Sequence, residues 1–256
     1  GRVVEGDALV MAVGVTPDTA LARDAGLELN EKGAIVVDPS YRTSDPDIYA
    51  VGDAIQVYSA LTGQPMQLAL AGPAQKQARQ AADSICGRPV RNTGYIGSSC
   101  IKVFDYNAAS TGLTAAQCEK AGIPYDFVYV MPPDRVSLMP GSTPLHYKLI
   151  YQVPTGRVLG VQAISKGDAP KRADIAATLI KFGGTVDDLR DLELCYAPPF
   201  STAKDAGNNA ALVACNLLDG AFRQVQVTGV RGLVEAVACV IQVGEAGQVG
   251  RPHLKS

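Results

Sequence analysis

The sequence predicts an α/β portion followed by an α+β domain, and three observations support this division. Apolar runs at residues 9–13 and 48–51 each end in a glycine, which is typical of parallel strands buried on both faces. Residues 71–86 have the alanine-rich composition of a helix. After a change of composition near residues 88–94, alternating apolar residues predict hairpin strands, with helices between them.

The first elements carry no evident chemistry. Residues 7–13 predict a strand that ends at Gly14, and Pro17 continues the turn. Residues 27–38 fit a hairpin turned at Lys32-Gly33. We expect Gly14 and Pro17 to shape a turn rather than to contact a ligand.

A glycine and a carboxylate follow the second apolar run. Ligands of open α/β sheets bind at the carboxyl ends of the strands, where Gly52 and Asp53 would lie. Gly52 has no side chain to block the close approach of a cofactor, and Asp53 offers an acceptor to sugar or ribityl hydroxyls. The pattern indicates a nucleotide-cofactor site, and the alternative is a surface turn after a core strand.

The helix predicted at residues 71–86 begins with small residues and a proline. Leu70, Ala71 and Gly72 leave room for a flat ligand, and Pro73 fits the first turn, where no amide hydrogen is needed. The free N–H groups of that turn carry partial positive charge and favour an electron-rich group. Gly87 ends the helix. The alternative is an ordinary amphipathic helix with a proline at its start.

The glycine–carboxylate step followed by this helix resembles the second flavin motif of the pyridine nucleotide-disulfide oxidoreductase superfamily. The resemblance implies that residues 1–93 hold the end of an NAD(P)H domain and the C-terminal part of an FAD-binding domain. It also implies FAD as the cofactor and NAD(P)H as the electron donor. The residues that it assigns to FAD in this part are Gly52, Asp53, Leu70, Ala71, Gly72 and Pro73.

The superfamily opens with a Gly-x-Gly-x-x-Gly turn for the ADP half of FAD, and this sequence contains no such turn. Its first residues also lack a methionine start and a signal or transit pattern. We therefore expect a fragment or split product without the N-terminal half and its redox cysteine. The isolated chain should accordingly be inactive.

Residues 94–220 resemble the interface (dimerisation) domain of the superfamily, which implies a homodimer. A helix should begin near Thr114, and another should run from Asp168 to Lys181, with Gly183 after its end. The side chains expected in the core on this second helix are Ile175, Leu179 and Phe182. The predicted strands cover residues 98–106, 126–131, 146–151 and 157–165, the last two joined as a hairpin around residues 153–156.

The segment from Tyr196 to Asp205 reads Tyr-Ala-Pro-Pro-Phe-Ser-Thr-Ala-Lys-Asp and is similar to the coenzyme A-disulfide reductase and NADH oxidase branch of the superfamily. Its two prolines stiffen the loop. The resemblance implies that Tyr196 is catalytic, reaching the partner's flavin and redox cysteine to donate a hydrogen bond or a proton to sulfur. It also places Phe200 at the cofactor. The alternative is a tyrosine packed on Pro198.

Two residues outside this segment, Met139 and Cys195, bear on this resemblance. Met139 stands where the branch often has a second aromatic residue, which weakens the disulfide-reductase assignment relative to a generic flavin reductase or oxidase. Cys195 precedes the loop and is expected to be a small buried apolar group rather than the redox cysteine.

Residues 221–256 are expected to form a linker and a degenerate rhodanese-like start. Residues 230–235, 240–245 and 253–255 resemble the opening of such a domain. Gln242 and Gly244 replace the usual Asp and Arg, and no catalytic cysteine loop follows. We expect no sulfur transfer, and a plain linker is the alternative.

Composition narrows the function classes. A net charge of −2 without a dense Lys/Arg run argues against nucleic acid or an anionic membrane as partner. The apolar runs fall short of the ~20 residues that a bilayer requires. Six scattered cysteines without a Cys-x-x-Cys pair indicate a reducing, cytoplasmic location. Only two histidines are present, so no metal site is expected.

These observations favour an FAD-dependent NAD(P)H oxidoreductase of the coenzyme A-disulfide reductase type, with a small-molecule disulfide or oxygen as the acceptor. One alternative is an NADH oxidase or peroxidase-type flavoenzyme. A second alternative, from another class, is a catalytically inactive dimerisation or interaction module.

Overall fold

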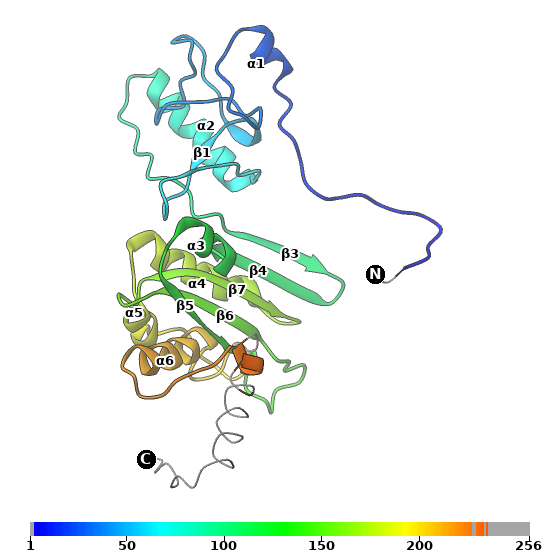
Figure 1. Cartoon of the computed structure of the whole chain (residues 1–256), viewed down its shortest axis with the longest axis vertical. Helices are drawn as coiled ribbons and strands as arrows, with labels where there is room; N and C mark the ends of the chain where they lie inside the picture. Colours follow the sequence, from blue (N-terminus) through cyan, green and yellow to red (C-terminus); the bar gives the residue numbers. More distant parts are fainter. Residues whose placement is uncertain (1–2, 227–228, 233, 235–256) are drawn as a thin grey trace, which may run out of the picture. The chain divides into compact units, whose positions relative to one another are not determined.

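The structure is a computed structural model that describes residues 3–226, 229–232 and 234 (Figure 1). The chain divides into one compact unit of residues 1–214 and a second of residues 215–256. The helix α6 (Ala206–Leu218) ends in the second unit and is followed by a turn at Gly220, whose φ is 71°. The predicted rhodanese-like segments at 240–245 and 253–255 lie outside the described residues.

The first part of the chain contains short elements. They are α1 (Ala20–Asp24), the 3₁₀ turn η1 (Gly52–Ala54), β1 (Val57–Tyr58), β2 (Pro65–Met66) and α2 (Ala71–Ile85). The predicted helix at residues 71–86 is thus confirmed. The hairpin predicted at 27–38 is present as a turn with an antiparallel bridge between Leu29 and Ile35, and Gly33 has a φ of 80°.

The two buried strands predicted at residues 7–13 and 48–51 are wrong. Residues 3–13 contain no strand, and Val13 is 89% exposed. Val51 has an extended backbone but is 37% exposed, and only Tyr49 of this run forms a bridge, to Arg42. An apolar run becomes a strand only where a neighbour supplies the ladder of hydrogen bonds, and the described residues offer isolated bridges here.

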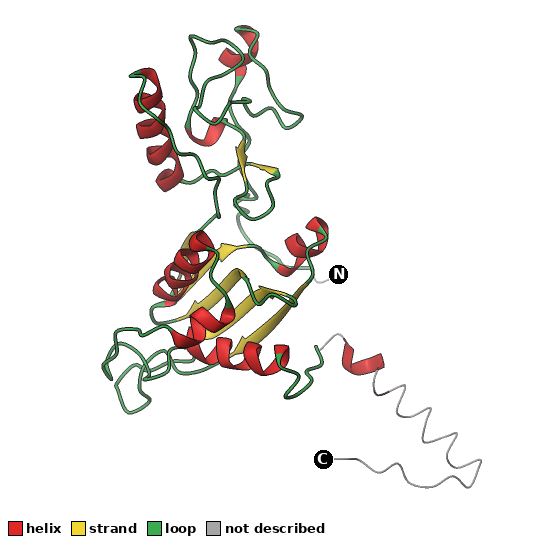
Figure 2. Ribbon diagram, turned by 90° about the vertical axis from the view of Figure 1, so that its left-hand side faces the viewer, coloured by secondary structure: helices red, strands yellow, loops and turns green. Residues whose placement is uncertain are grey.

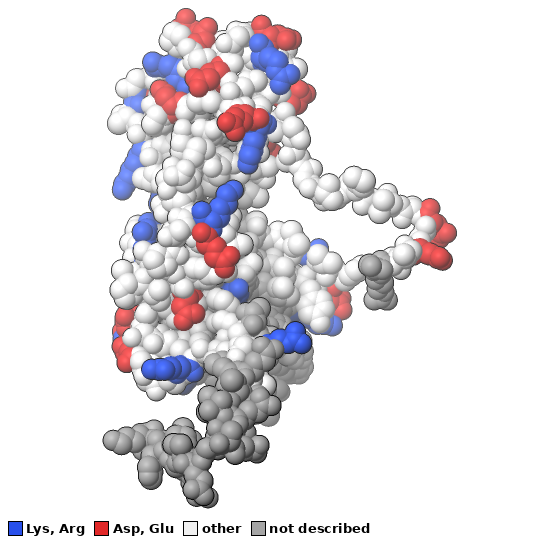
Figure 3. All heavy atoms as spheres, viewed as in Figure 1, with Lys and Arg blue, Asp and Glu red and all other residues white. Residues whose placement is uncertain are grey.

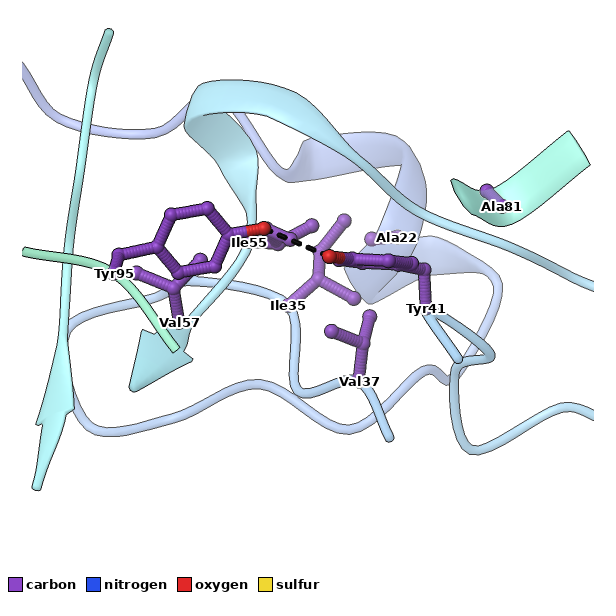
Figure 4. Close-up of a cluster of buried hydrophobic side chains, with 8 residues drawn as sticks. All are labelled: Ala22, Ile35, Val37, Tyr41, Ile55, Val57, Ala81 and Tyr95. Carbon is purple, nitrogen blue, oxygen red and sulfur yellow. Dashed lines mark hydrogen bonds between the residues drawn. The ribbon is translucent and has the colours of Figure 1, made fainter. Parts of the chain in front are cut away.

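The core of this part is a cluster of aliphatic side chains closed by two tyrosines (Figure 4). The hydroxyls of Tyr41 and Tyr95 lie 2.7 Å apart, and the Tyr41 hydroxyl donates to Oε1 of Gln80 at 2.6 Å. Burial and the hydrogen bond to Tyr95 raise the pKa of Tyr41. The members of the cluster are Ala22, Ile35, Val37, Tyr41, Ile55, Val57, Ala81 and Tyr95.

The second part is built on a five-stranded antiparallel sheet in the order β3-β4-β7-β6-β5 (Figure 2). The strands are β3 (Ser99–Val103), β4 (Tyr106–Gly112), β5 (Tyr125–Val130), β6 (His146–Gln152) and β7 (Val158–Ser165). The strands predicted near 126–131, 146–151 and 157–165 are confirmed. The strand predicted at 98–106 is wrong in extent, because the chain turns at Phe104, whose φ is 51°, and returns as β4.

Three further helices accompany the sheet: α3 (Ala115–Ala121), α4 (Ala169–Phe182) and α5 (Val186–Asp191). As predicted, α3 begins next to Thr114, the side chain of Asp168 caps α4, and Gly183 ends α4. The side chain of Thr114 caps α3, and Gly183 has a left-handed conformation. None of the helices in the described part of the chain has the length and hydropathy of a membrane-spanning segment.

The face of α4 that packs on β4 and β7 differs from the predicted one. Phe182 was expected in the core and is 83% exposed, whereas Ala173, Ala176 and Ile180 are buried. A Cβ on Gly112 would lie 2.8 Å from Cδ1 of Ile180 and 2.1 Å from the carbonyl oxygen of Leu159. Gly112 therefore leaves room for Ile180, and the small buried side chains of Ala173 and Ala176 let α4 pack closely on the sheet.

Candidate functional site

The turn at Gly52 is bonded directly to helix α2. The Gly52 N–H donates to Oε1 of Gln77 at 2.6 Å, and Gly52 has a φ of 86°, a conformation that favours glycine. The Gln77 side chain is fully buried, and its Nε2 has no hydrogen-bond partner among the described residues. A buried amide with one unused donor group indicates a site where a further acceptor is expected.

The N-terminus of α2 is open. Leu70 precedes it with an extended backbone, no side chain caps the first turn, and no acidic residue lies in that turn. Ala71 and Gly72 are exposed, and Pro73 lacks an N–H, so two free amides point out of the helix start. Their partial positive charge favours an electron-rich ligand.

Asp53 is exposed on η1, which contacts α2. The structure therefore brings together the residues that the sequence assigned to FAD in this part of the chain: Gly52, Asp53, Leu70, Ala71, Gly72 and Pro73. Sequence reasoning missed Gln77. Its signal was the spacing of Ala74, Gln77 and Ala81, which places an amide on the face of α2 that carries small residues.

A groove of about 1070 Å³ reaches the residue that precedes α2. Apolar side chains on one of its walls include Met66, Leu68 and Leu70, and neutral polar side chains such as Gln67 and Gln162 also line it. A concave site with apolar walls and a few polar groups is typical of small-molecule binding.

Charged side chains of both signs are interspersed on the visible face (Figure 3). On α2, Asp83 pairs with Arg79 at 3.2 Å and with Arg88 at 3.3 Å, and the hydrogen bond from Arg79 lowers the pKa of Asp83. The carboxylate of Asp83 therefore offsets the positive charge of these two arginines. The described residues contain no group of three or more His, Cys, Asp or Glu side chains that could hold a metal ion.

Tyr196 and Phe200 belong to a second region of the chain, the segment between α5 and α6. Tyr196 is 50% exposed and Phe200 is 71% exposed, whereas Ser201 is buried. The Ala197 carbonyl accepts from the Phe200 N–H at 2.9 Å, which folds the segment into a turn. Cys195 was expected to be buried and is exposed, because it lies outside any helix or strand, next to the exposed Tyr196.

The base of this segment holds a buried ion pair that sequence reasoning did not find. Nη2 of Arg172 lies 2.8 Å from Oδ2 of Asp205, and the two side chains are 2% and 3% exposed. Arg172 also donates to the carbonyl oxygens of Asp168 at 2.9 Å and Asp134 at 3.0 Å. An arginine in an alanine-rich helix is more often a solvated residue, so no local signal marked it.

Both parts of the chain match models of one known protein family. Residues 1–78 match the family model described as pyridine nucleotide-disulphide oxidoreductase, and residues 98–206 match the dimerisation domain of the same family. The first match contains η1 and the start of α2. The second contains the sheet and the segment with Tyr196.

Individual relatives are also similar. The coenzyme A disulfide reductase of Staphylococcus epidermidis is 32% identical over 209 residues, which are 81% of this chain and 47% of that protein. The structure of reduced Bacillus anthracis CoADR-RHD has 41% identity and a TM-score of 0.87, covering 92% of this chain and 42% of that one. The NAD-dependent persulfide reductase from A. fulgidus has 38% identity and a TM-score of 0.80, covering 84% of this chain and 40% of that one.

The chain thus spans about half the length of the curated relatives that it matches, with 47% coverage of the Staphylococcus epidermidis protein. Within that span, the two adjoining family matches and the agreement of the folds point to one origin. The chain belongs to the pyridine nucleotide-disulphide oxidoreductase superfamily.

Proposed function

We propose that this chain is part of an FAD-dependent, NAD(P)H-linked oxidoreductase most like coenzyme A disulfide reductase. The observation that carries the proposal is the bond between Gly52 and Gln77, which holds a glycine–carboxylate turn beside the open N-terminus of α2. This pairing lies inside the matched oxidoreductase region.

The residues present fit the flavin end of FAD. Asp53 offers an acceptor to ribityl hydroxyls, and the amides of Ala71 and Gly72 offer donors to an edge that gains negative charge on reduction. The unpaired Nε2 of Gln77 supports the presence of an acceptor near this turn. When bound, FAD supplies the hydride-accepting ring, and the protein supplies its orientation and electrostatic surroundings.

We assign the electron-acceptor side to Tyr196. Its hydroxyl would donate a hydrogen bond or a proton to a sulfur leaving group of a small disulfide, and Phe200 would pack against the cofactor of a second copy in a homodimer. The exposure of both aromatic side chains supports contact beyond their own segment. The match of residues 98–206 to a dimerisation domain supports the homodimer. Free cysteines such as Cys86 and Cys100 support a reducing compartment, which we take to be the cytoplasm.

The competing function is a dimerisation module without catalysis. It is favoured by the five-stranded sheet with its helices, which has a buried core of its own. An NADH oxidase is the nearer alternative, because Met139 offers no hydroxyl to a disulfide substrate.

The test is stopped-flow kinetics on the chain combined with the N-terminal part of a coenzyme A disulfide reductase. Tyr196→Phe should slow turnover with the disulfide and leave flavin reduction by NAD(P)H nearly unchanged, because the hydroxyl acts after hydride transfer. Tyr106→Phe is the matched control, since Tyr106 is similarly exposed at 49%. Slowed flavin reduction in Tyr196→Phe would assign Tyr196 another role, and a combined protein without flavin would favour the module.

A further inference from the structure

The segment with Tyr196 is exposed in its middle and buried at its end. It leaves α5 after Leu192 and reaches α6 at Asp205, which is 3% exposed. Tyr196 and Phe200 project between these points. Two prolines stiffen the middle, but stiffness there does not fix the direction in which the whole segment points.

One side chain joins the two ends. Asn208 is 8% exposed in the first turn of α6. Its Nδ2 donates to the carbonyl oxygens of Leu192 at 3.1 Å and Leu189 at 3.0 Å, and its Oδ1 accepts from the Asp205 N–H at 3.1 Å. The side chain therefore uses both donor and acceptor to hold the start and the finish of the segment together.

The C-terminal end of the segment is also bonded to α4. Arg172 forms the buried ion pair with Asp205, and the Asp205 carboxylate also accepts from the Gly207 N–H at 3.3 Å. In the middle of the segment, the Val136 N–H donates to the Pro198 carbonyl at 3.3 Å, and the hydroxyl of the buried Ser201 donates to the Cys195 carbonyl at 3.4 Å. Among these contacts, Asn208 alone bonds to both ends of the segment.

We propose that Asn208 is a positioning residue that sets the orientation of the Tyr196 segment. This inference rests on the catalytic role proposed for Tyr196. Without Asn208, the carbonyl of Leu192 and the N–H of Asp205 lose their common partner, and the ordered segment regains backbone freedom. The aromatic side chains would then sample several directions instead of one.

The sequence contains no tryptophan, which allows a single fluorescent reporter in the segment. Phe200→Trp places it at a position that is already 71% exposed. In this background, Asn208→Ala should lower the anisotropy of the reporter and raise its acrylamide quenching constant by less than about twofold, because a 71% exposed position is already accessible to the quencher. Both are measured at a temperature where circular dichroism shows the chain to be folded.

Asn107→Ala is the matched control. Nδ2 of Asn107 also donates to two backbone carbonyls, those of Gly167 at 2.8 Å and Lys166 at 3.3 Å, but it lies on β4 and has no bond to the segment. It should lower stability without changing the reporter signal. Equal quenching in the Asn208→Ala and reference proteins, or an equal rise in Asn107→Ala, overturns the proposal.

If Asn208→Ala does not fold, Asn208→Asp provides the same comparison, because a carboxylate keeps an acceptor for the Asp205 N–H and lacks a donor for Leu192. Its reporter signal should also rise, and an unchanged signal overturns the proposal. The measurement requires neither flavin nor turnover. It can therefore fail while Tyr196→Phe behaves as expected, and it can succeed while the catalytic role of Tyr196 fails.

Discussion

The Gly52 N–H and the Gln77 side chain, 25 residues apart in sequence, share a 2.6 Å hydrogen bond that joins η1 to α2. No strand of the described residues links these two elements directly, so a side chain provides the connection that a sheet ladder provides elsewhere. The bond fixes where Asp53 stands relative to the helix N-terminus.

Replacing Gln77 by leucine should lower the free energy of unfolding by about 1–3 kcal/mol, because the Gly52 N–H loses its acceptor. Urea denaturation followed by circular dichroism measures the change. Gln75→Leu is the control on the same helix, since Gln75 is exposed, and it should alter stability by about 0.5 kcal/mol or less. Equal losses of unfolding free energy in the two variants would show that the hydrogen bond to Gly52 does not contribute measurably to stability.

Stability should fall above pH 10 through Tyr147, which is completely buried. Burial raises its pKa in the folded state above the ordinary value of 10.0, and the charge of Asp205 acts in the same direction. Above pH 10 the unfolded chain releases a proton that the folded chain keeps, so unfolding becomes easier by about 1.4 kcal/mol per pH unit. Below pH 10 Tyr147 is neutral in both the folded and the unfolded chain, so its contribution to stability is fully present. Tyr147→Phe should flatten the alkaline slope in urea titrations, and a slope equal to that of the parent would refute this assignment.

At pH 7 the buried tyrosines Tyr147 and Tyr41 should respond differently to replacement by phenylalanine. The Tyr147 hydroxyl has no hydrogen-bond partner among the described residues, so Tyr147→Phe should be neutral or slightly stabilising. The Tyr41 hydroxyl bonds to Tyr95 and Gln80, and Tyr41→Phe should lower the free energy of unfolding by about 1–3 kcal/mol. Thermal or urea unfolding compares the two variants. A larger loss of stability in Tyr147→Phe than in Tyr41→Phe would contradict the hydrogen bonding described for the two hydroxyls.

The proposed homodimer should involve the sheet face that carries Ile101 and Ile164. These residues share one cross-strand row with Ala108, and they are 63% and 47% exposed. Exposed apolar rows of this kind mark association surfaces. Ile101→Asp should weaken dimerisation about tenfold or more in sedimentation velocity. Leu138→Asp, at a loop position that is 93% exposed, should leave it unchanged. A concentration-independent monomer, or equal weakening by both variants, would exclude this surface.

Local signals predicted the parts of the fold that depend on neighbouring residues. Thr114 caps a helix, and Asp168 and Gly183 bound another, because capping is decided within one turn. The start of α2, which no side chain caps, was predicted from Pro73, because proline favours the first turn of a helix. The hairpin of β3 and β4 was not, since its turn at Phe104 has no glycine and β4 is rich in Ala and Ser, which only the sheet register holds as a strand.

Burial was harder to predict because it depends on partners distant in sequence. Phe182 has core spacing but is exposed at the last residue of α4, whereas Arg172 is buried because Asp205 neutralises it. Gln77 and Asn208 bear on the candidate sites through hydrogen bonds to backbone groups 25 and 16 residues away, which no local pattern marks.

The most direct test of the account is a titration of the 256-residue chain with FAD, monitored by flavin fluorescence. The sequence lacks the Gly-x-Gly-x-x-Gly turn for the pyrophosphate, so a few contacts at η1 and α2 should give a dissociation constant in the micromolar range or weaker. Asp53→Ala should weaken binding further, and Asp47→Ala, an exposed aspartate in the same loop, should not. Binding of FAD that is unaffected by Asp53→Ala, or no binding at millimolar flavin, would contradict the claim that η1 and the N-terminus of α2 form a flavin site.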